Sequence, residues 1–291
     1  LVMLILPAGI ITQKRYLLLI PGLILWPSQS RQYKDLTLTV LDVGMGTSIV
    51  VQTQHHSLIY DFGPGNQHGF SLGEWAVLPF MRDQGLGTPD RIILSHSDQD
   101  HVGGFYAVQQ SFKGVPVYSG TPQRVMELFP TLKPVFDCHT QALWWWDGVK
   151  FEFLQGAKPP RATDNNRSCV LKITGSVQSI LLTGDIEAVQ ERNLLTNHQA
   201  QLKSDILIAP HHGSLTSSTS EFIQAVSPQQ VLFSVGFLNR WKFPRPQVLK
   251  RYLKHHAKTY ATDELGAIQI NCTGEHCDLS SYRRQHARLW Y

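Results

Sequence analysis

Charged residues are scarce in this chain of 291 residues, because Lys, Arg, Asp and Glu together make up 16% of it. Soluble domains usually contain about 25% of these residues, so the deficit suggests a membrane nearby. The first residues also lack an apolar run of roughly 20 residues, the length that spans a bilayer. The runs Leu1–Ile11 and Leu17–Trp26 are both shorter, and a basic break at 13–15 separates them.

We interpret Leu17–Trp26 as the end of a membrane-spanning helix, or as an interfacial segment, of a larger membrane protein from which this chain is cut. A signal peptide is disfavoured, because the first residues have neither a positively charged start nor a small-residue cleavage site. The alternative is a buried N-terminal helix of the domain that follows.

The chain has only four cysteines, and no two of them form a Cys-x-x-Cys pair, which argues against a zinc finger. Cys272 and Cys277 flank a Thr-Gly-Glu-His segment that can close as a disulfide hairpin in an oxidising compartment, with free thiols as the alternative. The formal net charge of +4 suits a polyanionic ligand such as nucleic acid without requiring one.

After a linker at 27–34, short β-rich runs alternate with Gly, Pro and Asp, a pattern typical of strands and turns. Strands are expected at Leu36–Val43, Thr47–Gln52, Ser57–Asp61, Arg91–Leu94, Val115–Tyr118, Val149–Leu154, Ser168–Ile173, Ser179–Leu182, Asp205–Ile208, Gln230–Ser234 and Thr259–Ala261. Helical periodicity predicts helices at Gly104–Phe112, Gln123–Leu128, Ala188–Leu195, Ser218–Ala225 and Pro246–His256. Since neither type gathers in one half of the chain, we predict one α/β domain with two sheets covered by helices.

The segment Ile92–Gly104 begins as an apolar strand and ends in two glycines that open a helix. Between them lie four possible metal ligands within six residues: His96, Asp98, Asp100 and His101. Imidazole and carboxylate groups in one tight turn suit a divalent cation, because the turn has already gathered them. A solvated polar loop is the alternative, but this density of ligand types before Gly-Gly favours a metal site.

This run resembles the H-x-H-x-D-H motif of the metallo-β-lactamase superfamily, with Asp98 in the place of the second histidine. The variant is similar to the S-H-x-D-x-D-H-x-G-G run in the C-terminal domain of the ComEC family of DNA-internalisation competence proteins. Further runs match in order: Leu41–Gly44 with Gly46, Tyr60–Gly63, Trp146–Val149, Asn165–Ser168, Leu182–Asp185 and Pro210–Ser214. The resemblance implies an αββα sandwich at 35–291, preceded by a membrane junction and linker at 1–34.

The resemblance also implies a site for two divalent metal ions and no organic cofactor. His96 and Asp98 are expected to hold one ion and Asp100 and His101 the other, with Asp185 bridging the two. A carboxylate in place of an imidazole makes the first position harder, so manganese is as acceptable an expectation as zinc.

One ligand is expected from the pair His211 and His212. We favour His212, with His211 facing the scissile phosphate, and the reverse assignment stays open. Asp61 is expected to support the metal loop from behind. In catalysis, Asp100 is expected to orient the attacking water and accept its proton. His211, with Ser168 or Asn166, is expected to stabilise charge on the phosphoryl oxygens.

In two places the sequence departs from the superfamily pattern, so the roles of superfamily residues cannot be assigned there by position. The histidine that many members place before the bridging aspartate has no clear counterpart, and Asp164–Asn166 occupy that stretch. The histidine before a proline near Asn239 is also missing. The loop there alternates cations with aromatic residues: Arg240, Trp241, Lys242, Phe243 and Arg245. Such a loop can contact a phosphate backbone and stack bases, or else be a basic surface loop with its aromatics packed inward.

The ligand cluster alone is compatible with hydrolysis of a lactam, a thioester or a phosphodiester. The resemblance implies the extracytoplasmic domain of a DNA-uptake channel in the bacterial inner membrane, with DNA and the channel portion of the same protein as partners. Its expected activity is nucleolytic removal of the strand that is not imported. The alternatives are a phosphodiesterase or esterase acting on a small or wall-associated substrate, and a DNA-binding module that gates the channel without cutting.

Overall fold

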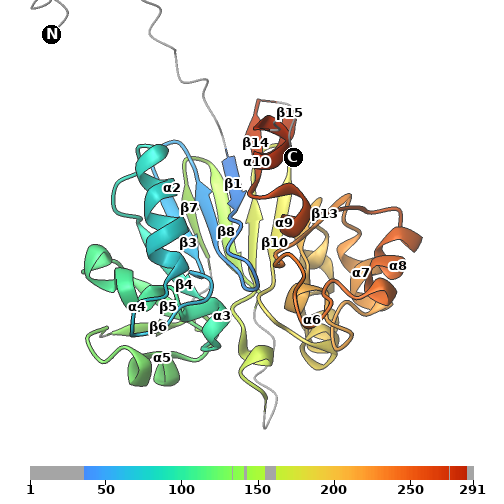
Figure 1. Ribbon diagram of the computed structural model, residues 1–291. Coiled ribbons are helices and arrows are strands. Elements are labelled where there is room, and N and C mark those ends of the chain that lie inside the picture. Colours follow the sequence, from blue (N-terminus) through green and yellow to red (C-terminus); the bar gives the residue numbers. More distant parts are fainter. Residues whose placement is uncertain (1–35, 133, 141–142, 155–161, 275, 287–291) are drawn as a thin grey trace, which may run out of the picture. The chain divides into compact units, whose positions relative to one another are not determined.

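The computed structural model describes residues 36–132, 134–140, 143–154, 162–274 and 276–286, all within one unit of the fold (Figure 1). The predicted membrane junction and linker at 1–34 lie outside the described residues, so their assignment stays a prediction. Within the described part of the chain, no helix combines the length and the hydropathy needed to cross a membrane.

The first sheet has eight strands in the order β15-β14-β1-β2-β3-β4-β5-β6. Strands β3 to β6 are parallel, and the remaining neighbours pair antiparallel. The bounds are β1 Leu36–Val40, β2 Ile49–Gln52, β3 Ser57–Tyr60, β4 Arg91–Leu94, β5 Val117–Ser119, β6 Val135–Asp137, β14 Ile268–Thr273 and β15 His276–Ser281. Apolar residues at alternate positions of β1, namely Leu36, Leu38 and Val40, point into the core between the sheets.

The second sheet has seven strands in the order β13-β12-β11-β10-β9-β8-β7. It mixes a parallel part, β10 to β13, with an antiparallel part, β7 to β10. The bounds are β7 Leu143–Trp146, β8 Val149–Phe153, β9 Leu171–Thr174, β10 Ser179–Leu182, β11 Ile206–Ile208, β12 Gln230–Phe233 and β13 Lys258–Ala261. Because parallel neighbours need a crossover connection, the 15-residue helix α6 joins β10 to β11.

Helices cover the outer face of each sheet, which gives the predicted αββα layering (Figure 1). The helices are α2 Leu78–Asp83, α3 Gln99–Val102, α4 Phe105–Val108, α5 Pro122–Leu128, α6 Ala188–Leu202, α7 Ser220–Val226, α8 Pro246–Lys254, α9 Thr262–Leu265 and α10 Tyr282–Gln285. Shorter turns are the π-helical η3 Gly73–Val77 and the 3₁₀ turns η4 Gln109–Phe112, η5 Asn165–Arg167 and η6 Pro210–Gly213.

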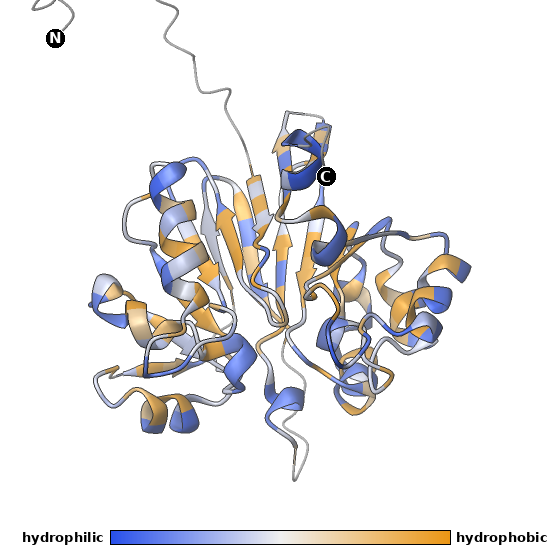
Figure 2. Cartoon of the chain, viewed as in Figure 1, coloured by the Kyte–Doolittle hydropathy of each residue, from blue (hydrophilic) through white to orange (hydrophobic). Residues whose placement is uncertain are grey.

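Three apolar clusters hold these layers together, and the apolar strands at the centre are visible in Figure 2. One cluster fills the space between the sheets and includes Tyr60 and Ile173. A second lies between the first sheet and α2, α4 and α5, with Phe105 at its centre. The third lies between the second sheet and α6, α7 and α8, and includes Phe222. Burial of these side chains on both faces of both sheets is the main force that fixes the fold.

The predicted elements agree with the structure best where the sequence is most apolar. Strands Arg91–Leu94 and Ser179–Leu182 have the predicted bounds, and the helix predicted from Gly104 to Phe112 is α4 continued by η4. Strands β6, β7, β14 and β15 were not predicted. The helix predicted at Ala188–Leu195 extends to Leu202.

All four cysteines form disulfides. The open question about Cys272 and Cys277 is resolved as a bond across the β14–β15 hairpin, where the two residues are direct partners. The second bond, Cys138–Cys169, joins the end of β6 in the first sheet to the residues before β9 in the second. A separation of 31 residues gives no local sequence signal, so this bond was not predicted.

The parallel strands bring the candidate site residues together. Asp61 follows β3, and the run His96–His101 follows β4, its parallel neighbour. Asp185 follows β10 and His212 follows β11, which are parallel neighbours in the other sheet. Parallel neighbours end at the same edge, and ligand sites in α/β proteins lie beyond such carboxyl ends.

Candidate metal centre

Four side chains from the two sheets converge at these strand ends. Ligand atoms of Asp100, His101, Asp185 and His212 all lie within 4.8 Å of one another, and all but Asp100 are buried. His101 Nε2 is 3.1 Å from Asp185 Oδ1 and 3.3 Å from His212 Nε2. His212 Nε2 is 3.2 Å from Asp100 Oδ2 and 3.5 Å from Asp185 Oδ2. Two imidazoles and two carboxylates at this spacing are a suitable donor set for a divalent cation.

The far nitrogen of each imidazole is fixed by an acceptor behind it. His101 Nδ1 donates to Asp61 Oδ2 at 2.7 Å, and His212 Nδ1 donates to the carbonyl of Ser234 at 2.9 Å. Asp61 is held in turn by the backbone N–H and the hydroxyl of Ser95, both at 2.7 Å. Because Nδ1 of each ring is engaged by this acceptor, Nε2 is the nitrogen that each ring directs at the cluster.

His96 and Asp98 lie beside this cluster. The two imidazoles of His96 and His101 have ring centres 4.2 Å apart, and His96 Nε2 is 3.5 Å from Asp98 Oδ2. The His96 ring is fully buried, whereas the side chain of Asp98 is 50% exposed. Asp98 therefore faces the opening of the site.

His211 lies at the edge of the cluster, more exposed than His212. Its Nε2 is 3.7 Å from Asp185 Oδ2, and its Nδ1 is 3.2 Å from Thr216 Oγ1 and 3.7 Å from Glu187 Oε1. Burial lowers the pKa of His211, although Asp185 and Glu187 oppose this shift. The geometry groups His212 with the other possible ligands and leaves His211 facing outward, as the favoured assignment has it.

Ser168 and Asn166 are close to the site but are hydrogen-bonded to protein groups. The Ser168 hydroxyl accepts from the backbone N–H of Asp185 at 3.0 Å and lies 3.3 Å from His96 Nδ1. The Asn166 amide donates to Glu187 Oε2 and accepts from the Glu187 backbone N–H. Both residues support the site through these contacts, and their contact with substrate stays a prediction.

Several polar atoms in the cluster have no hydrogen-bond partner within the protein. Among the described residues, His96 Nε2 and Asp185 Oδ1 are buried and make no hydrogen bond, although each lies within 3.5 Å of an oppositely charged side chain. His101 Nε2 and His212 Nε2 lie 3.3 Å apart, and both are directed at the carboxylates of Asp185 and Asp100. Leaving such atoms buried and unpaired costs about 1–3 kcal/mol each. A shared cation satisfies all of them, so these residues fit the metal centre that the motif implies.

The pKa shifts of the cluster also fit a bound divalent cation. Burial on its own would lower the pKa of His101, but Asp185 and Asp61 raise it well above its usual value. Burial would raise the pKa of Asp185, but His101 and His212 hold it well below its usual range. The pKa of Asp100 is lowered by the same imidazoles against the effect of burial. A buried set of charged groups this close together is what a divalent cation neutralises.

The backbone is strained at three site residues. Asp61, His211 and His212 have φ values of 61°, 47° and 53°, in the left-handed region that non-glycine residues rarely adopt. Such strain costs on the order of 1–3 kcal/mol per residue and occurs preferentially at functional sites.

The glycines of the metal loop are required by close backbone contacts. A Cβ on Gly104 would lie 2.1 Å from the carbonyl oxygen of Phe62, so only glycine lets the α3 turn approach the loop of Asp61. Gly184, next to Asp185, has φ of 53°, and a Cβ there would lie 2.7 Å from the Cβ of Ser168. Each glycine thus lets two loops of its own sheet approach closely beside the candidate ligands.

The basic and aromatic loop after β12 lies next to His211. The backbone N–H of Arg245 donates to the carbonyl of Gly213, and the Phe243 ring is 6.0 Å from the His211 ring. The Arg240 guanidinium lies 4.1 Å from the centre of the Trp241 ring, which is 41% exposed. Both Arg240 and Lys242 are exposed. The loop therefore lies beside the candidate site, and its contact with nucleic acid stays a prediction.

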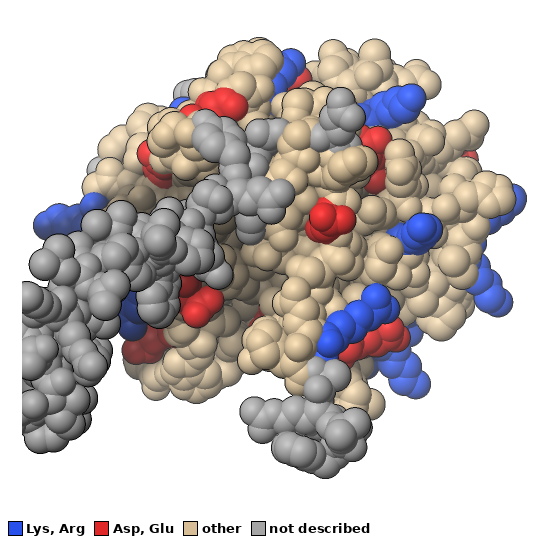
Figure 3. All heavy atoms as spheres, turned by 90° about the horizontal axis from the view of Figure 1, so that it is seen from above, with Lys and Arg blue, Asp and Glu red and all other residues tan. Residues whose placement is uncertain are grey.

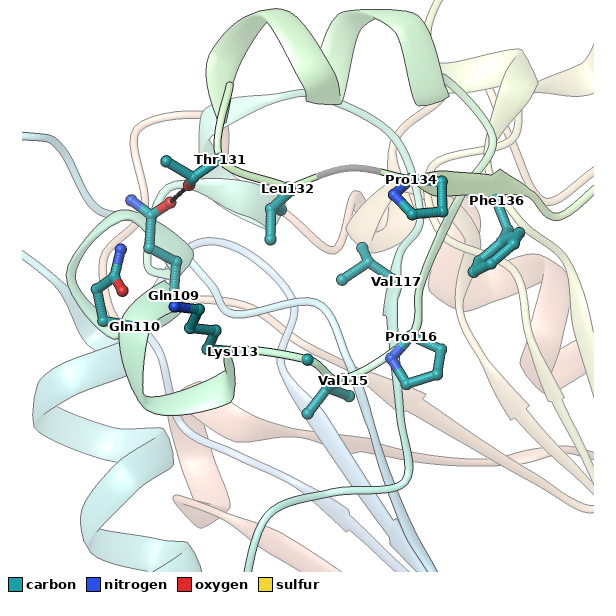
Figure 4. Close-up of a pocket in the computed structure, with 11 residues that line it drawn as sticks. Gln109, Gln110, Lys113, Val115, Pro116, Val117, Thr131, Leu132, Pro134 and Phe136 are labelled. Atoms are coloured by element: carbon teal, nitrogen blue, oxygen red, sulfur yellow. Dashed lines mark hydrogen bonds between the residues drawn. The ribbon is translucent and has the colours of Figure 1, made fainter.

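A cavity elsewhere on the domain lacks the ligand side chains of the metal centre. A cavity of about 590 Å³ lies between the starts of β5 and β6, lined by residues such as Pro116, Pro134 and Phe136 (Figure 4). It lies at the amino ends of the parallel strands, and none of its described lining residues is His, Cys, Asp or Glu. It carries no part of this site.

Comparison with known proteins identifies the family. A model of the metallo-beta-lactamase superfamily matches residues 41–236. The chain belongs to this superfamily. Among solved structures, an isothiocyanate hydrolase from Delia radicum gut bacteria superposes with a TM-score of 0.51 and 14% identity, covering 77% of this chain and 95% of that one. At this identity the likeness shows the fold alone.

Curated relatives confirm the resemblance to competence proteins. Competence protein ComA of Neisseria gonorrhoeae is 33% identical over 268 residues, 92% of this chain and 37% of that protein. ComE operon protein 3 of Bacillus subtilis is 30% identical over 253 residues, 79% of this chain and 32% of that protein. The chain thus spans about a third of the length of these relatives.

Three groups that shape this metallo-β-lactamase site were missed from the sequence. Ser95 stands inside the motif and holds Asp61, a role that its position directly before His96 makes plausible. Glu187 holds Asn166 and approaches His211, two residues after Asp185. Ser234 contributes through its carbonyl, so its side-chain type gives no signal.

Proposed function

We propose that this domain is the metal-dependent phosphodiesterase of a DNA-uptake channel and that it degrades the DNA strand that is not imported. The observation that carries the proposal is the convergence of Asp100, His101, Asp185 and His212 from two sheets. The competence relatives supply the biological context, and the role of the whole protein is part of the proposal because the chain matches only about a third of them.

Two divalent ions, zinc or manganese, are proposed as the cofactor. Asp100, His101 and His212 would hold one, His96 and Asp98 the other, and Asp185 would lie between them. When bound, such a pair supplies a nucleophile at neutral pH and stabilises the charge that develops at phosphorus.

The protein groups then orient the reactants. Asp100 has its side chain 35% exposed at the mouth of the cluster, where its carboxylate can align a water and accept a proton. His211 faces outward beside Asp185 and is placed to contact a phosphoryl oxygen. Ser168 and Asn166 fix His96 and the Asp185 loop and so keep this geometry constant.

The loop Arg240–Arg245 is proposed to hold the DNA backbone next to the site. Exposed cations gain affinity by releasing counterions from phosphates, and an exposed indole such as Trp241 can stack on any base. On the face shown in Figure 3, Lys and Arg side chains are scattered among neutral and acidic residues, so that face offers no continuous basic surface.

The two disulfides support an extracytoplasmic location. Disulfides form and persist in oxidising compartments, and every cysteine of the chain is paired. We therefore place this domain on the outer side of the bacterial inner membrane, attached to the channel portion of the same protein.

The test is hydrolysis of labelled single-stranded DNA, duplex DNA and bis-p-nitrophenyl phosphate by the purified chain with zinc or manganese. We expect cleavage of DNA by the wild type and its loss in Asp185→Asn. Asp90→Asn is the matched control, because Asp90 caps the start of β3 at the opposite end of the sheet. Cleavage of the small reporter alone would show a small-substrate phosphodiesterase, and metal-dependent DNA binding without any cleavage would show a gating module.

A further inference from the structure

We infer that the disulfide Cys138–Cys169 positions the candidate metal centre, so that the chain acquires its full metal affinity only after this bond has formed. The inference rests on the metal cofactor of the proposed function and not on DNA as the substrate. It assigns a role in the centre to two cysteines that lie outside the superfamily motifs of the sequence.

Cys169 is the residue at which three strands of the first sheet are joined to the second sheet. Its backbone N–H donates to the carbonyl of Ser95, which follows β4, at 3.0 Å. Its carbonyl accepts from the hydroxyl of Tyr60, the last residue of β3, at 2.5 Å. Its sulfur is bonded to Cys138, which follows β6. Because Cys169 itself lies just before β9, a single residue connects strand ends of both sheets.

The partners of Cys169 in the first sheet stand next to groups that form the centre. Tyr60 directly precedes Asp61, the carboxylate behind the metal loop. Ser95 directly precedes His96, and its own N–H and hydroxyl donate to Asp61 at 2.7 Å. A displacement of Cys169 therefore reaches both Asp61 and His96 through one intervening residue each.

On the side of the second sheet, Cys169 is joined by a peptide bond to Ser168. The Ser168 hydroxyl accepts from the backbone N–H of Asp185 at 3.0 Å and lies 3.3 Å from His96 Nδ1. Because the peptide unit is planar and rigid, Ser168 cannot keep both contacts when Cys169 moves. The disulfide thus holds in place a residue that contacts one candidate ligand from each sheet.

All parts of this junction are buried. Cys138 and Cys169 are each 1% exposed, and Tyr60 and Ser95 are fully buried. A close-packed interior transmits small shifts, so loss of the covalent bond at this point should be felt at the ligands. The other disulfide, Cys272–Cys277, joins β14 and β15 at one edge of the first sheet, with β1 and β2 between it and β3. It is therefore an internal control.

The state of the bond depends on the compartment. Reduction of Cys138–Cys169 takes two electrons and two protons from two thiols, such as two glutathione molecules, which become a disulfide. Cytosolic thiols keep cysteines reduced, so a newly made chain would have low metal affinity there and would gain it in an oxidising compartment. Linkage requires that bound metal oppose this reduction by the same factor by which the bond raises metal affinity.

The first experiment is a titration of the full chain with Mn²⁺, which prefers oxygen and nitrogen donors and so competes little with thiols. The double variant Cys138→Ala/Cys169→Ala should bind Mn²⁺ about 10–100-fold more weakly than the wild type, the usual cost of losing a group that orients ligands. Cys272→Ala/Cys277→Ala should bind it as the wild type does. Near-UV circular dichroism shows whether each variant is folded.

If the first double variant does not fold, Tyr60→Phe carries the test, because it keeps the disulfide and removes only the hydroxyl bonded to the Cys169 carbonyl. It should weaken Mn²⁺ binding. Tyr252→Phe is the matched control, since Tyr252 is also fully buried and its hydroxyl bonds to Ser218 in another apolar cluster. A disulfide that only stabilises the fold would leave the Mn²⁺ affinity of both tyrosine variants unchanged.

The second experiment uses the wild type alone. Glutathione buffers of graded redox potential are applied with and without Mn²⁺, and alkylation followed by mass spectrometry measures each disulfide separately. Mn²⁺ should protect Cys138–Cys169 against reduction and leave Cys272–Cys277 unaffected. Equal protection of both bonds or of neither, or an unchanged Mn²⁺ affinity in the folded Cys138→Ala/Cys169→Ala variant, would overturn the inference.

The proposed function can fail separately. Mn²⁺ affinity that depends on Cys138–Cys169 in a chain that cleaves no DNA would overturn the proposed nuclease and leave the inference standing. DNA cleavage by a chain whose Mn²⁺ affinity ignores this bond would do the reverse. Absence of any bound metal ion would overturn both.

Discussion

Asp61 shows how much of the metal centre depends on residues that need not contact an ion. Its buried carboxylate accepts from His101 Nδ1 and from two groups of Ser95, so one side chain orients a ligand and anchors the strand end that carries the motif. Its left-handed backbone places the carboxylate under the loop, and Asp and Asn tolerate this conformation better than most residues.

We predict that Asp61→Asn lowers metal affinity by about 10–100-fold without unfolding the domain, because asparagine keeps the backbone conformation and loses the charge behind His101. Metal titration of the purified variant measures the effect. Asp147→Asn is the matched control. Asp147 also has a left-handed backbone, with φ of 49°, and also binds a histidine, His55, at 2.9 Å.

Asp147 lies in the turn before β8 and contacts the turn before β3, at the opposite end of the sandwich from Asp61. Its substitution should leave metal affinity unchanged. Equal losses in the two variants would mean that the effect comes from general loosening of the fold and would contradict a specific role for Asp61.

Lys172 gives a pH-dependent prediction away from the site. Its ammonium group is buried on the outer face of β9, where it donates to the Lys203 carbonyl and to Ser204 Oγ. Burial lowers its pKa from 10.5 to about 8, although Asp205 and Glu152 oppose the shift. Between these two values the unfolded chain binds more protons than the folded one, so stability should rise with pH in this interval.

Urea unfolding of the wild type and of Lys172→Met on both sides of pH 8 isolates this contribution. The difference between their free energies of unfolding should move in favour of the wild type as the pH rises above about 8. A difference that does not change with pH would show that Lys172 titrates normally in the folded protein.

At the scale of single elements, the loop after β12 carries exposed cations and an exposed indole next to His211. We predict that replacing Arg240, Lys242 and Arg245 together by alanine weakens binding of single-stranded DNA. The slope of log affinity against log salt should shrink by about 0.7 for each lost phosphate contact. Hydrolysis of bis-p-nitrophenyl phosphate should survive, because the loop holds no metal ligand.

The control triple variant replaces Lys113, Lys203 and Lys258, which are all exposed. Lys113 and Lys203 precede β5 and β11 and Lys258 begins β13, so all three lie at the end of the sheets away from the metal centre. It makes the same change in net charge but should leave the salt slope unchanged. If both triple variants reduce DNA affinity equally, net charge and not the loop is responsible.

Elements with strong periodic or apolar signals were predictable, and those that depend on distant partners were not. Strand β4 is three apolar residues and an arginine beside turn residues, and its bounds follow directly from that pattern. Strand β15 is mostly polar and has no clear apolar pattern. It forms because it pairs with β14, which in turn pairs with β1 from more than two hundred residues earlier in the chain. Helix α3 has four residues, which is too short to show a period.

The same reasoning applies to the site. The motif spacing identifies His96, Asp98, Asp100 and His101, because ligands in one loop are neighbours in the sequence. The acceptor behind His212 is a main-chain carbonyl of Ser234, 22 residues away, and nothing in the sequence marks it. The residues proposed to bind metal are thus visible in the sequence, and most of those that support them are not.

At the scale of the whole molecule, the disulfides should contribute unequally to stability. Cross-linking restricts the unfolded chain more when the closed loop is longer. The separation of 31 residues in Cys138–Cys169 predicts a contribution of about 4 kcal/mol, and the separation of 5 in Cys272–Cys277 predicts about 2 kcal/mol. Denaturant unfolding of the two double Cys→Ala variants under oxidising conditions measures both.

The difference between the variants should vanish when the wild type and both variants are unfolded in a reducing agent. A larger loss from removing Cys272–Cys277 would contradict the loop-length argument. It would indicate that the β14–β15 hairpin, at the edge of the first sheet, depends on its cross-link to form at all.

The left-handed backbone at His211 and His212 also limits how this protein can be engineered. Glycine would release strain at either position, but at His212 it would also leave the buried Ser234 carbonyl without its donor. A selection for heat resistance alone should therefore favour His211→Gly and enrich stable but inactive variants. Mutant libraries selected for higher thermal stability should therefore keep His211 and His212 unchanged. Conversely, we expect a member of this family with glycine at both positions to have no hydrolytic activity.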